Sequence, residues 1–245
     1  MTIDLNADVG EGCDDRSLMP FLTSANIACG GHAGDDQTMS AVVAEALRLG
    51  ISLGAHPSYV DREGFGRRDV EVSRRSLEEA IRSQIHALAS IAARRGARLT
   101  HVKPHGALYN RAARDADVAR AVARAVADVD RSLYLVGLAG SALLVAAAEE
   151  RIKSAAEAFA DRGYAPDGSL LDRGLRGALI RDPAVAAAQA VSIARDGEVL
   201  ASDGSRIRLH ADTICLHGDT ERAVDFARAI RDSLASAGIA VAAFR

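Results

Sequence analysis

The sequence predicts an α/β fold, a TIM-like (β/α) barrel of seven or eight strands that forms one domain over residues 1–245. Short apolar runs suited to buried strands alternate about seven times with segments suited to helices, as in a parallel sheet with helical crossovers. This alternation alone also allows an open, doubly wound sheet. Polar residues at the carboxyl ends of several strands favour the barrel, because in a barrel those ends meet at one mouth.

The strands are expected where short apolar runs occur. In chain order, these runs are residues 3–7, 25–28, 51–55, 99–103, 133–138, 155–159, 213–217 and 239–244. A further segment, residues 198–209, has Asp203 and Gly204 at its centre and polar residues around them. This pattern predicts a β-hairpin inserted before the strand at 213–217.

Two helices have clear signals at their start. Residues 76–95 repeat apolar side chains at spacings of three and four, and Ser76 with Glu79 predicts a capping box at the first turn. Asp182 followed by Pro183 is an N-cap with proline at the first helical position, which predicts a helix through residue 194.

Composition excludes several classes of protein. The chain is 49% hydrophobic and 26% charged with a formal net charge of -3, so no basic excess is present to hold nucleic acid. Three cysteines, far apart and without a CxxC pair, predict neither a disulfide framework nor a thiolate zinc site, which fits a reducing cytoplasm. The N-terminus lacks a signal peptide pattern, and the longest apolar stretch, residues 133–148, is too short to cross a membrane.

The first candidate group is Asp4, Asn6 and Asp8 on the first strand. Alternate residues of a strand face the same side, so these three side chains point together. Polar groups inside a barrel are costly unless they are paired or take part in function, and we expect a functional role. The alternative is a strand end that makes a turn into the glycines that follow.

Two further groups follow the second and third strands. His32 follows Gly30 and Gly31, whose backbone can approach a ligand closely, while Cys29 is expected to be a small core residue. His56 lies at a strand end before a long loop that contains Arg67 and Arg68. These arginines are suited to clamp a carboxylate or phosphate, although for one of the two a solvated position on the loop is an equally good interpretation.

Lys103 and His105 flank Pro104 at the end of the fourth strand. The chain has two lysines and 28 arginines, so a lysine at this place is notable. An ammonium whose pKa burial can lower suits a catalytic or oxyanion-stabilising task. His101, within the strand, is expected to be a core histidine with its hydrogen bonds satisfied.

The rim of the mouth is completed by residues after the sixth and seventh strands, namely Glu157, Asp161, Arg162, His217 and Asp219. Asp219 is better explained as the N-cap of the last helix. The sequence has no GxxxxGK[ST] motif. If the protein uses ATP, a P-loop of this chain does not hold its phosphates.

Six ordered segments are similar to the LamB/YcsF family, and together they span nearly the whole chain: DLNADVGEG, SANIACGGHAGD, GAHPSYVDREGFGRR, HVKPHGALYN, EAFADRGY and CLHGD. The resemblance implies a distorted barrel related to glycoside hydrolases and polysaccharide deacetylases. It also implies a hydrolase for a cyclic amide, which opens 5-oxo-L-proline to L-glutamate together with partner subunits B and C. ATP with Mg²⁺ would be a co-substrate of that complex.

This activity suggests roles for the candidate residues. Asp8, His56 or His105 would be the general base that activates water. Lys103 with His32 would stabilise a developing oxyanion or phosphate. The remaining candidates would bind substrate, with the arginines taking its carboxylate: Asn6, Arg67, Arg68, Glu157, Asp161, Arg162 and His217.

Two other functions remain open at this point. The barrel relatives allow a metal-dependent amide or carbohydrate deacetylase, with Asp8, His32 and His56 as ligands. Alternatively, the chain is a non-catalytic subunit that positions the substrate for its partners. The sequence does not decide whether a metal binds.

Overall fold

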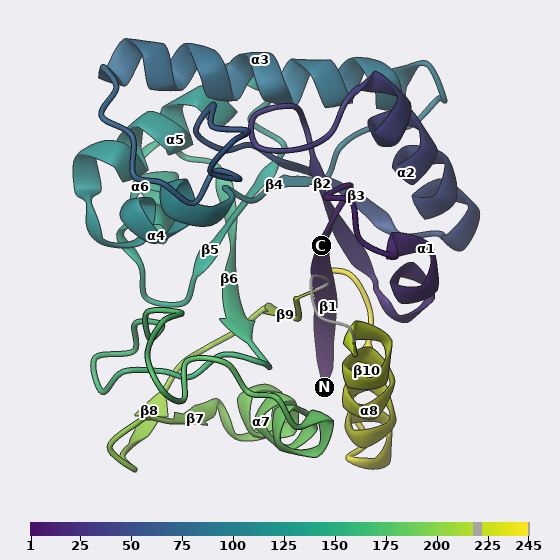
Figure 1. Cartoon of the computed structure of the whole chain (residues 1–245), viewed down its shortest axis with the longest axis vertical. Coiled ribbons are helices and arrows are strands. Elements are labelled where there is room, and N and C mark those ends of the chain that lie inside the picture. The colour runs from purple at the N-terminus through teal and green to yellow at the C-terminus, as the bar shows by residue number, and fades with distance from the viewer. Residues whose placement is uncertain (218–221, 245) are drawn as a thin grey trace.

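The computed structural model describes residues 1–217 and 222–244. Within them, parallel strands close into a barrel in which β1 pairs with both β2 and β9 (Figure 1). The closed barrel consists of β1 (Thr2–Val9), β2 (Ser24–Ala28), β3 (Ser52–His56), β4 (His101–Val102), β5 (Tyr134–Leu138), β6 (Lys153–Phe159) and β9 (Thr213–Cys215). The predicted (β/α) barrel is confirmed, with seven strands in the closed ring.

The eighth predicted strand, β10 (Ala240–Val241), lies outside the closed ring and pairs with the first residues of β1. Further along β1, Asp4 to Asn6 pair with β9 instead, and this pairing closes the barrel. The predicted hairpin is also confirmed, because β7 (Glu198–Leu200) and β8 (Arg206–Arg208) pair in antiparallel fashion.

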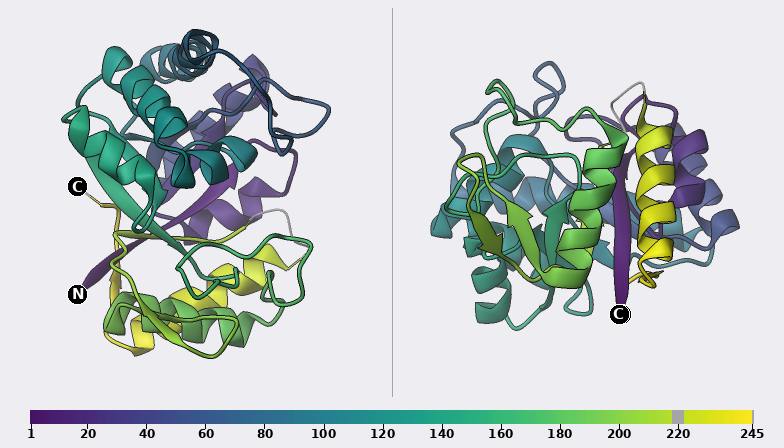
Figure 2. Two further views of the ribbon diagram at one scale, coloured as in Figure 1. Left: turned by 90° about the vertical axis from the view of Figure 1, so that its left-hand side faces the viewer. Right: turned by 90° about the horizontal axis from the view of Figure 1, so that it is seen from below.

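Helices surround the barrel, and two of them, α7 and α8, lie side by side on one flank (Figures 1 and 2). None of the described helices has both the length and the apolar composition that a membrane span needs. The helices are α1 (Asp15–Leu18), the 3₁₀ helix η1 (Met19–Phe21), α2 (Asp36–Leu49), α3 (Arg74–Ala93), α4 (Gly106–Arg114), α5 (Ala116–Val129), α6 (Ala142–Glu149), α7 (Pro183–Asp196) and α8 (Ala223–Ser236).

One predicted helix start is wrong and another is confirmed. Helix α3 begins earlier than expected, because Ser73 rather than Ser76 is its N-cap and accepts a hydrogen bond from the backbone N–H of Ser76. Asp182 caps α7 as predicted, with Pro183 in the first turn. The expected cap at Asp219 lies outside the described residues.

Near the start of β1, the interior of the barrel contains buried polar side chains that form hydrogen bonds with one another. Both carboxylate oxygens of the buried Asp4 accept hydrogen bonds from hydroxyl groups, Oδ1 from Thr23 and Ser24 and Oδ2 from Thr213. Burial raises the pKa of Asp4, and these hydroxyl groups partly offset the rise. Of the three polar residues on β1, Asp4 therefore has a structural role, since it lies deepest and its hydrogen bonds are made.

His101 is the core histidine that the sequence predicts. Its Nε2 lies 2.9 Å from Oδ1 of Asn26, and its Nδ1 lies 2.8 Å from the Thr100 hydroxyl. The ring reaches Asn26 across Gly54 of β3, where an added Cβ would overlap with Nε2. A glycine at position 54 is thus required for this hydrogen bond to form.

We expect Gly54→Ala to lower the free energy of unfolding by about 1–3 kcal/mol, because the new methyl group would push His101 off Asn26. Urea unfolding followed by circular dichroism measures the change. Gly174→Ala is the matched control, since a Cβ there meets nothing within 4 Å. Equal stability of the two variants would contradict the packing argument.

Candidate active site

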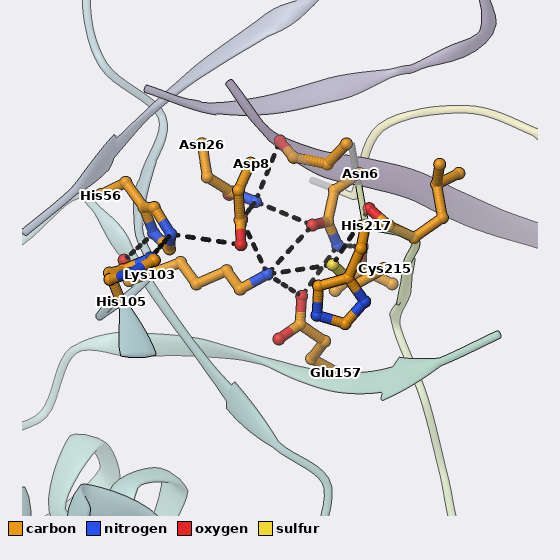
Figure 3. Close-up of polar contacts among 12 residues, drawn as sticks. Asn6, Asp8, Asn26, His56, Lys103, His105, Glu157, Cys215 and His217 are labelled. Atoms are coloured by element: carbon orange, nitrogen blue, oxygen red, sulfur yellow. Dashed lines mark hydrogen bonds and ion pairs between the residues drawn. The ribbon is translucent and has the colours of Figure 1, made fainter. Parts of the chain in front are cut away.

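A cavity of about 900 Å³ opens at the carboxyl ends of the barrel strands. Several of the predicted site residues line it, and others lie directly behind the lining (Figure 3). The lining includes Asp8, Glu11, His56, Arg67, Lys103, His105, Tyr109, Phe159, Arg162, Arg173 and His217.

The Lys103 ammonium lies at the centre of the site and is 2% exposed. Its Nζ donates to Oδ1 of Asp8 at 3.0 Å and pairs with Oε1 of Glu157 at 2.9 Å (Figure 3). It also lies 3.1 Å from Sγ of Cys215 and 3.5 Å from Oδ1 of Asn6. These partners come from β1, β6 and β9, so closure of the barrel is what gathers them.

Burial by itself would lower the pKa of Lys103, as the sequence suggested. The carboxylates of Asp8 and Glu157 outweigh that effect and raise the pKa well above its usual value. Burial would likewise raise the pKa of Asp8, but the charges of His56 and Lys103 hold it well below its usual range. Lys103 is therefore a fixed cation and Asp8 a fixed anion, which suits electrostatic stabilisation rather than proton transfer by the lysine.

Behind Lys103, a network of hydrogen bonds fixes the surrounding asparagine and carboxylate side chains. Asn6 donates from Nδ2 to Oε1 of Glu157 at 3.0 Å and to the Thr213 hydroxyl at 2.6 Å. Asn26 donates to Oδ1 of Asn6 at 2.8 Å and to Oδ1 of Asp8 at 2.9 Å. Asn6 and Glu157 are buried, and their polar atoms hold Lys103 and Asp8 in place.

Four side chains gather on the other side of Asp8. His32, His56 and His105 surround Oε1 of Glu11, with nitrogen to oxygen distances of 2.7, 3.7 and 3.2 Å. One ligand atom from each of the four residues lies within 4.8 Å of the others. Asp8, by contrast, contacts only His56 in this group, through Oδ2 at 3.2 Å from Nε2.

Of the ligand set considered from the sequence, Asp8, His32 and His56, the two histidines lie in this group of four. Glu11 and His105 complete the group that the structure brings together, and Asp8 lies at its edge beside Lys103.

His217 and Asp161 form an oriented pair on the opposite rim. Nδ1 of His217 lies 2.9 Å from both carboxylate oxygens of Asp161, and the His217 backbone N–H donates to Oδ2 at 2.8 Å. The imidazole stacks on the Phe159 ring with centroids 5.7 Å apart. Burial would raise the pKa of Asp161, but His217 lowers it below the usual value. Asp161 thus fixes the ring through Nδ1, and Nε2 makes no hydrogen bond to the part of the chain that the structure describes.

The three predicted arginines have different environments. Arg67 lines the cavity, with its guanidinium 5.1 Å from the centre of the Phe65 ring. Arg68 pairs with Asp61 and is not among the cavity-lining residues, so its predicted place at the site is wrong. Arg162 lines the cavity but donates to the carbonyl groups of Leu171 and Ala178, which stabilises the loop above the rim.

Sequence reasoning missed several residues of this site. Glu11 lies between Gly10 and Gly12, and an acid between two glycines at a strand end was an available signal. Tyr109 and Arg173 also line the cavity. Neither had a signal that distinguished it, because Tyr109 occupies the apolar face of α4 and Arg173 lies in an arginine-rich loop.

Comparison with known proteins gives consistent matches. The LamB/YcsF family model matches residues 3–245. The A subunit of the 5-oxoprolinase from Chloroflexus aggregans is 53% identical over 247 residues, which cover 98% of each chain. The lactam utilization protein of Thermus thermophilus has a solved structure with a TM-score of 0.95, 40% identity and full coverage of both chains. A deacetylase named T48 has a TM-score of 0.53 at 16% identity, covers 99% of this chain and 87% of its own, and shares the fold.

Proposed function

This chain belongs to the LamB/YcsF family, and we infer that it acts as the A subunit of a 5-oxoprolinase, a hydrolase that opens a cyclic amide. The proposed substrate is 5-oxo-L-proline and the product L-glutamate. The observation that carries the proposal is the arrangement of a fixed cation, Lys103, and an oriented imidazole, His217, on one cavity. Amide hydrolysis needs both a positive group for the developing oxyanion and a group that transfers protons.

We propose that ATP with Mg²⁺ is a co-substrate of a complex with subunits B and C. A five-membered lactam is stabilised by resonance, and phosphorylation of its carbonyl oxygen makes the carbon open to attack by water. The chain has no P-loop motif, so the partner subunits would perform the phosphorylation. The barrel would then open the activated ring: water adds to the carbon, and the C–N bond breaks with protonation of the ring nitrogen. Hydrolysis of the resulting acyl phosphate by a second water would release phosphate and L-glutamate.

Within this barrel, His217 is the proposed proton-transfer residue, since Asp161 holds its Nδ1 and leaves Nε2 for the substrate. Lys103 would stabilise the negative oxygen, and Asp8 would keep the ammonium in position. His56 and His105, proposed from the sequence as bases, also line the cavity, but Nε2 of His56 and Nδ1 of His105 lie 3.0 Å apart and contact each other. They are therefore weaker candidates for that role than His217.

The carboxylate of the substrate would be bound by Arg67, which lines the cavity and carries the planar guanidinium that a carboxylate pairs with. Arg67→Lys is expected to raise KM about tenfold or more with little change in kcat, because lysine lacks the planar, bidentate fork. Arg68→Lys is the matched control, since Arg68 pairs with Asp61 away from the cavity. A KM unchanged in Arg67→Lys would remove this assignment.

The overall proposal is tested by mixing the chain with subunits B and C, 5-oxoproline, ATP and magnesium, and by measuring glutamate and ADP together. We expect glutamate only when all components are present. Well-folded subunits that produce no glutamate in any combination would overturn the proposal. In that case, a metal-dependent amide deacetylase becomes the leading function, because Glu11, His32, His56 and His105 form a group that could hold a metal.

A further inference from the structure

We propose that Glu11, His32, His56 and His105 bind one divalent transition-metal ion at the mouth of the barrel. The proposal stands on the geometry of these side chains and does not depend on the lactam chemistry. The four residues come from four consecutive strand ends. Glu11 follows β1, His32 follows β2, His56 ends β3 and His105 follows β4. The barrel therefore delivers the ligand atoms together, within 4.8 Å of one another.

Backbone carbonyl groups fix the tautomers of two of these histidines. Nδ1 of His56 lies 2.7 Å from the Lys103 carbonyl oxygen, and Nε2 of His105 lies 3.0 Å from the Phe65 carbonyl oxygen. A carbonyl oxygen can only accept, so each of these nitrogens must carry a hydrogen. When the rings are neutral, as histidines that ligate a metal must be, the other nitrogen of each ring presents a lone pair.

Those two lone pairs face each other. Nε2 of His56 and Nδ1 of His105 are 3.0 Å apart, and Oε1 of Glu11 lies beside them. Two lone pairs and a carboxylate oxygen at such distances repel one another unless a positive charge lies among them. A metal ion supplies that charge, and hydrogen bonds from the outer nitrogens of ligating histidines to carbonyl groups are the usual surroundings of such sites.

His32 also belongs to this cluster. Its Nδ1 is buried and has no hydrogen-bond partner in the described part of the chain, while Nε2 lies 2.7 Å from Oε1 of Glu11. An unsatisfied buried imidazole nitrogen costs about 1–3 kcal/mol. The ring stacks on His105 with centroids 3.6 Å apart, so this unsatisfied group belongs to the same cluster.

The loop after β3 holds the rings in position. Phe65 has a positive φ of 54°, which is strained for a residue with a side chain, and this conformation accompanies the contact between its carbonyl group and His105. A Cβ at Gly66 would lie 2.9 Å from Cβ of His32 and 3.0 Å from Cδ2 of His105. The loop backbone thus packs directly on two of the rings, and the ligand atoms are already placed before an ion binds.

The donor set indicates the kind of metal. Three imidazole nitrogens and one carboxylate oxygen suit Zn²⁺ and other first-row transition metals, whereas Mg²⁺ prefers oxygen ligands and water. The site is therefore distinct in chemistry from the Mg²⁺ that accompanies ATP. When bound, such an ion would supply Lewis-acid polarisation of a carbonyl oxygen.

The test measures metal binding directly, without an activity assay. The purified full-length chain is freed of metal with a chelator and titrated with Co²⁺, read by visible absorption, and with Zn²⁺, read by calorimetry. We expect about one ion per chain and displacement of Co²⁺ by Zn²⁺. Glu11→Gln and His105→Asn should each weaken binding by at least about tenfold. His86→Asn, at an exposed histidine of α3, should bind as the wild type does.

Two results would overturn the proposal. One is a folded wild-type chain that binds no Co²⁺ or Zn²⁺, which would mean that a proton lies between His56 and His105. The other is equal binding by the wild type, Glu11→Gln and His105→Asn, which would place the ion elsewhere. If a variant does not fold, the wild-type titration alone decides, because absorption typical of imidazole ligation with one Co²⁺ bound supports the site and its absence overturns it.

Discussion

Lys103→Met is expected to reduce glutamate formation by the reconstituted complex about a thousandfold, since it removes the only ammonium at the described site. It should also lower the free energy of unfolding by about 3–5 kcal/mol, because Asp8 and the fully buried Glu157 would lose the cation that pairs them. Activity is measured as glutamate and ADP together, and stability by urea unfolding.

The chain offers a matched control and a way to separate the two effects. Lys153→Met changes the other lysine, which lies on the exposed start of β6, and should leave activity and stability near wild type. Adding Glu157→Gln to Lys103→Met removes one unpaired carboxylate and should recover part of the stability but none of the activity. Recovery of activity along with stability would show that Lys103 acts only as a structural cation. Wild-type turnover by a folded Lys103→Met variant would instead favour a non-catalytic, substrate-positioning subunit.

The residues at the strand ends were predictable from the sequence because of the geometry of a parallel barrel. Parallel strands in a barrel all run the same way, and polar side chains at their carboxyl ends therefore meet. This reasoning placed Asp8, His56, Lys103, His105 and His217 at one mouth, and all of them line the cavity. It depends only on the periodicity of the chain, so it needs no knowledge of loop conformation.

Residues in loops could not be placed by the same reasoning. Glu11 returns to the mouth because Gly10 and Gly12 both adopt positive φ, of 78° and 89°, and such turns are not encoded by strand periodicity. Arg67 and Arg68 are adjacent in sequence, yet one lines the cavity and the other pairs with Asp61. The loop backbone decides between these two directions.

The charge state of Lys103 likewise could not be predicted from the sequence. Burial alone lowers the pKa of a lysine, and the position of Lys103 in a strand end predicted burial. The carboxylates of Asp8 and Glu157 reverse this lowering of the pKa. They lie 95 and 54 residues from Lys103 along the chain (103 − 8 and 157 − 103). Only the closure of β1 and β6 around β4 brings them within hydrogen-bond distance of the ammonium.

His217→Ala should lower kcat about 10²- to 10⁴-fold, because the proposed proton-transfer group is lost while Lys103 and Arg67 still bind substrate. The exposed pair His210 and Asp212, with a nitrogen to oxygen distance of 3.2 Å, provides a matched control. His210→Ala removes a similar histidine from a similar carboxylate outside the cavity and should leave kcat unchanged.

Chemical rescue distinguishes proton transfer from a structural role of His217. Its ring stacks on Phe159 beside the cavity, so His217→Ala leaves a space at the rim that added imidazole can enter from the solvent. We expect imidazole to restore part of kcat in His217→Ala, whereas a positioning role for the ring would give no rescue by a free base. Asp161→Asn should also lower kcat, because the imidazolium formed during the reaction would lose the carboxylate that stabilises it. If His217→Ala keeps wild-type kcat, the proton is transferred elsewhere, and the assignment to this pair is wrong.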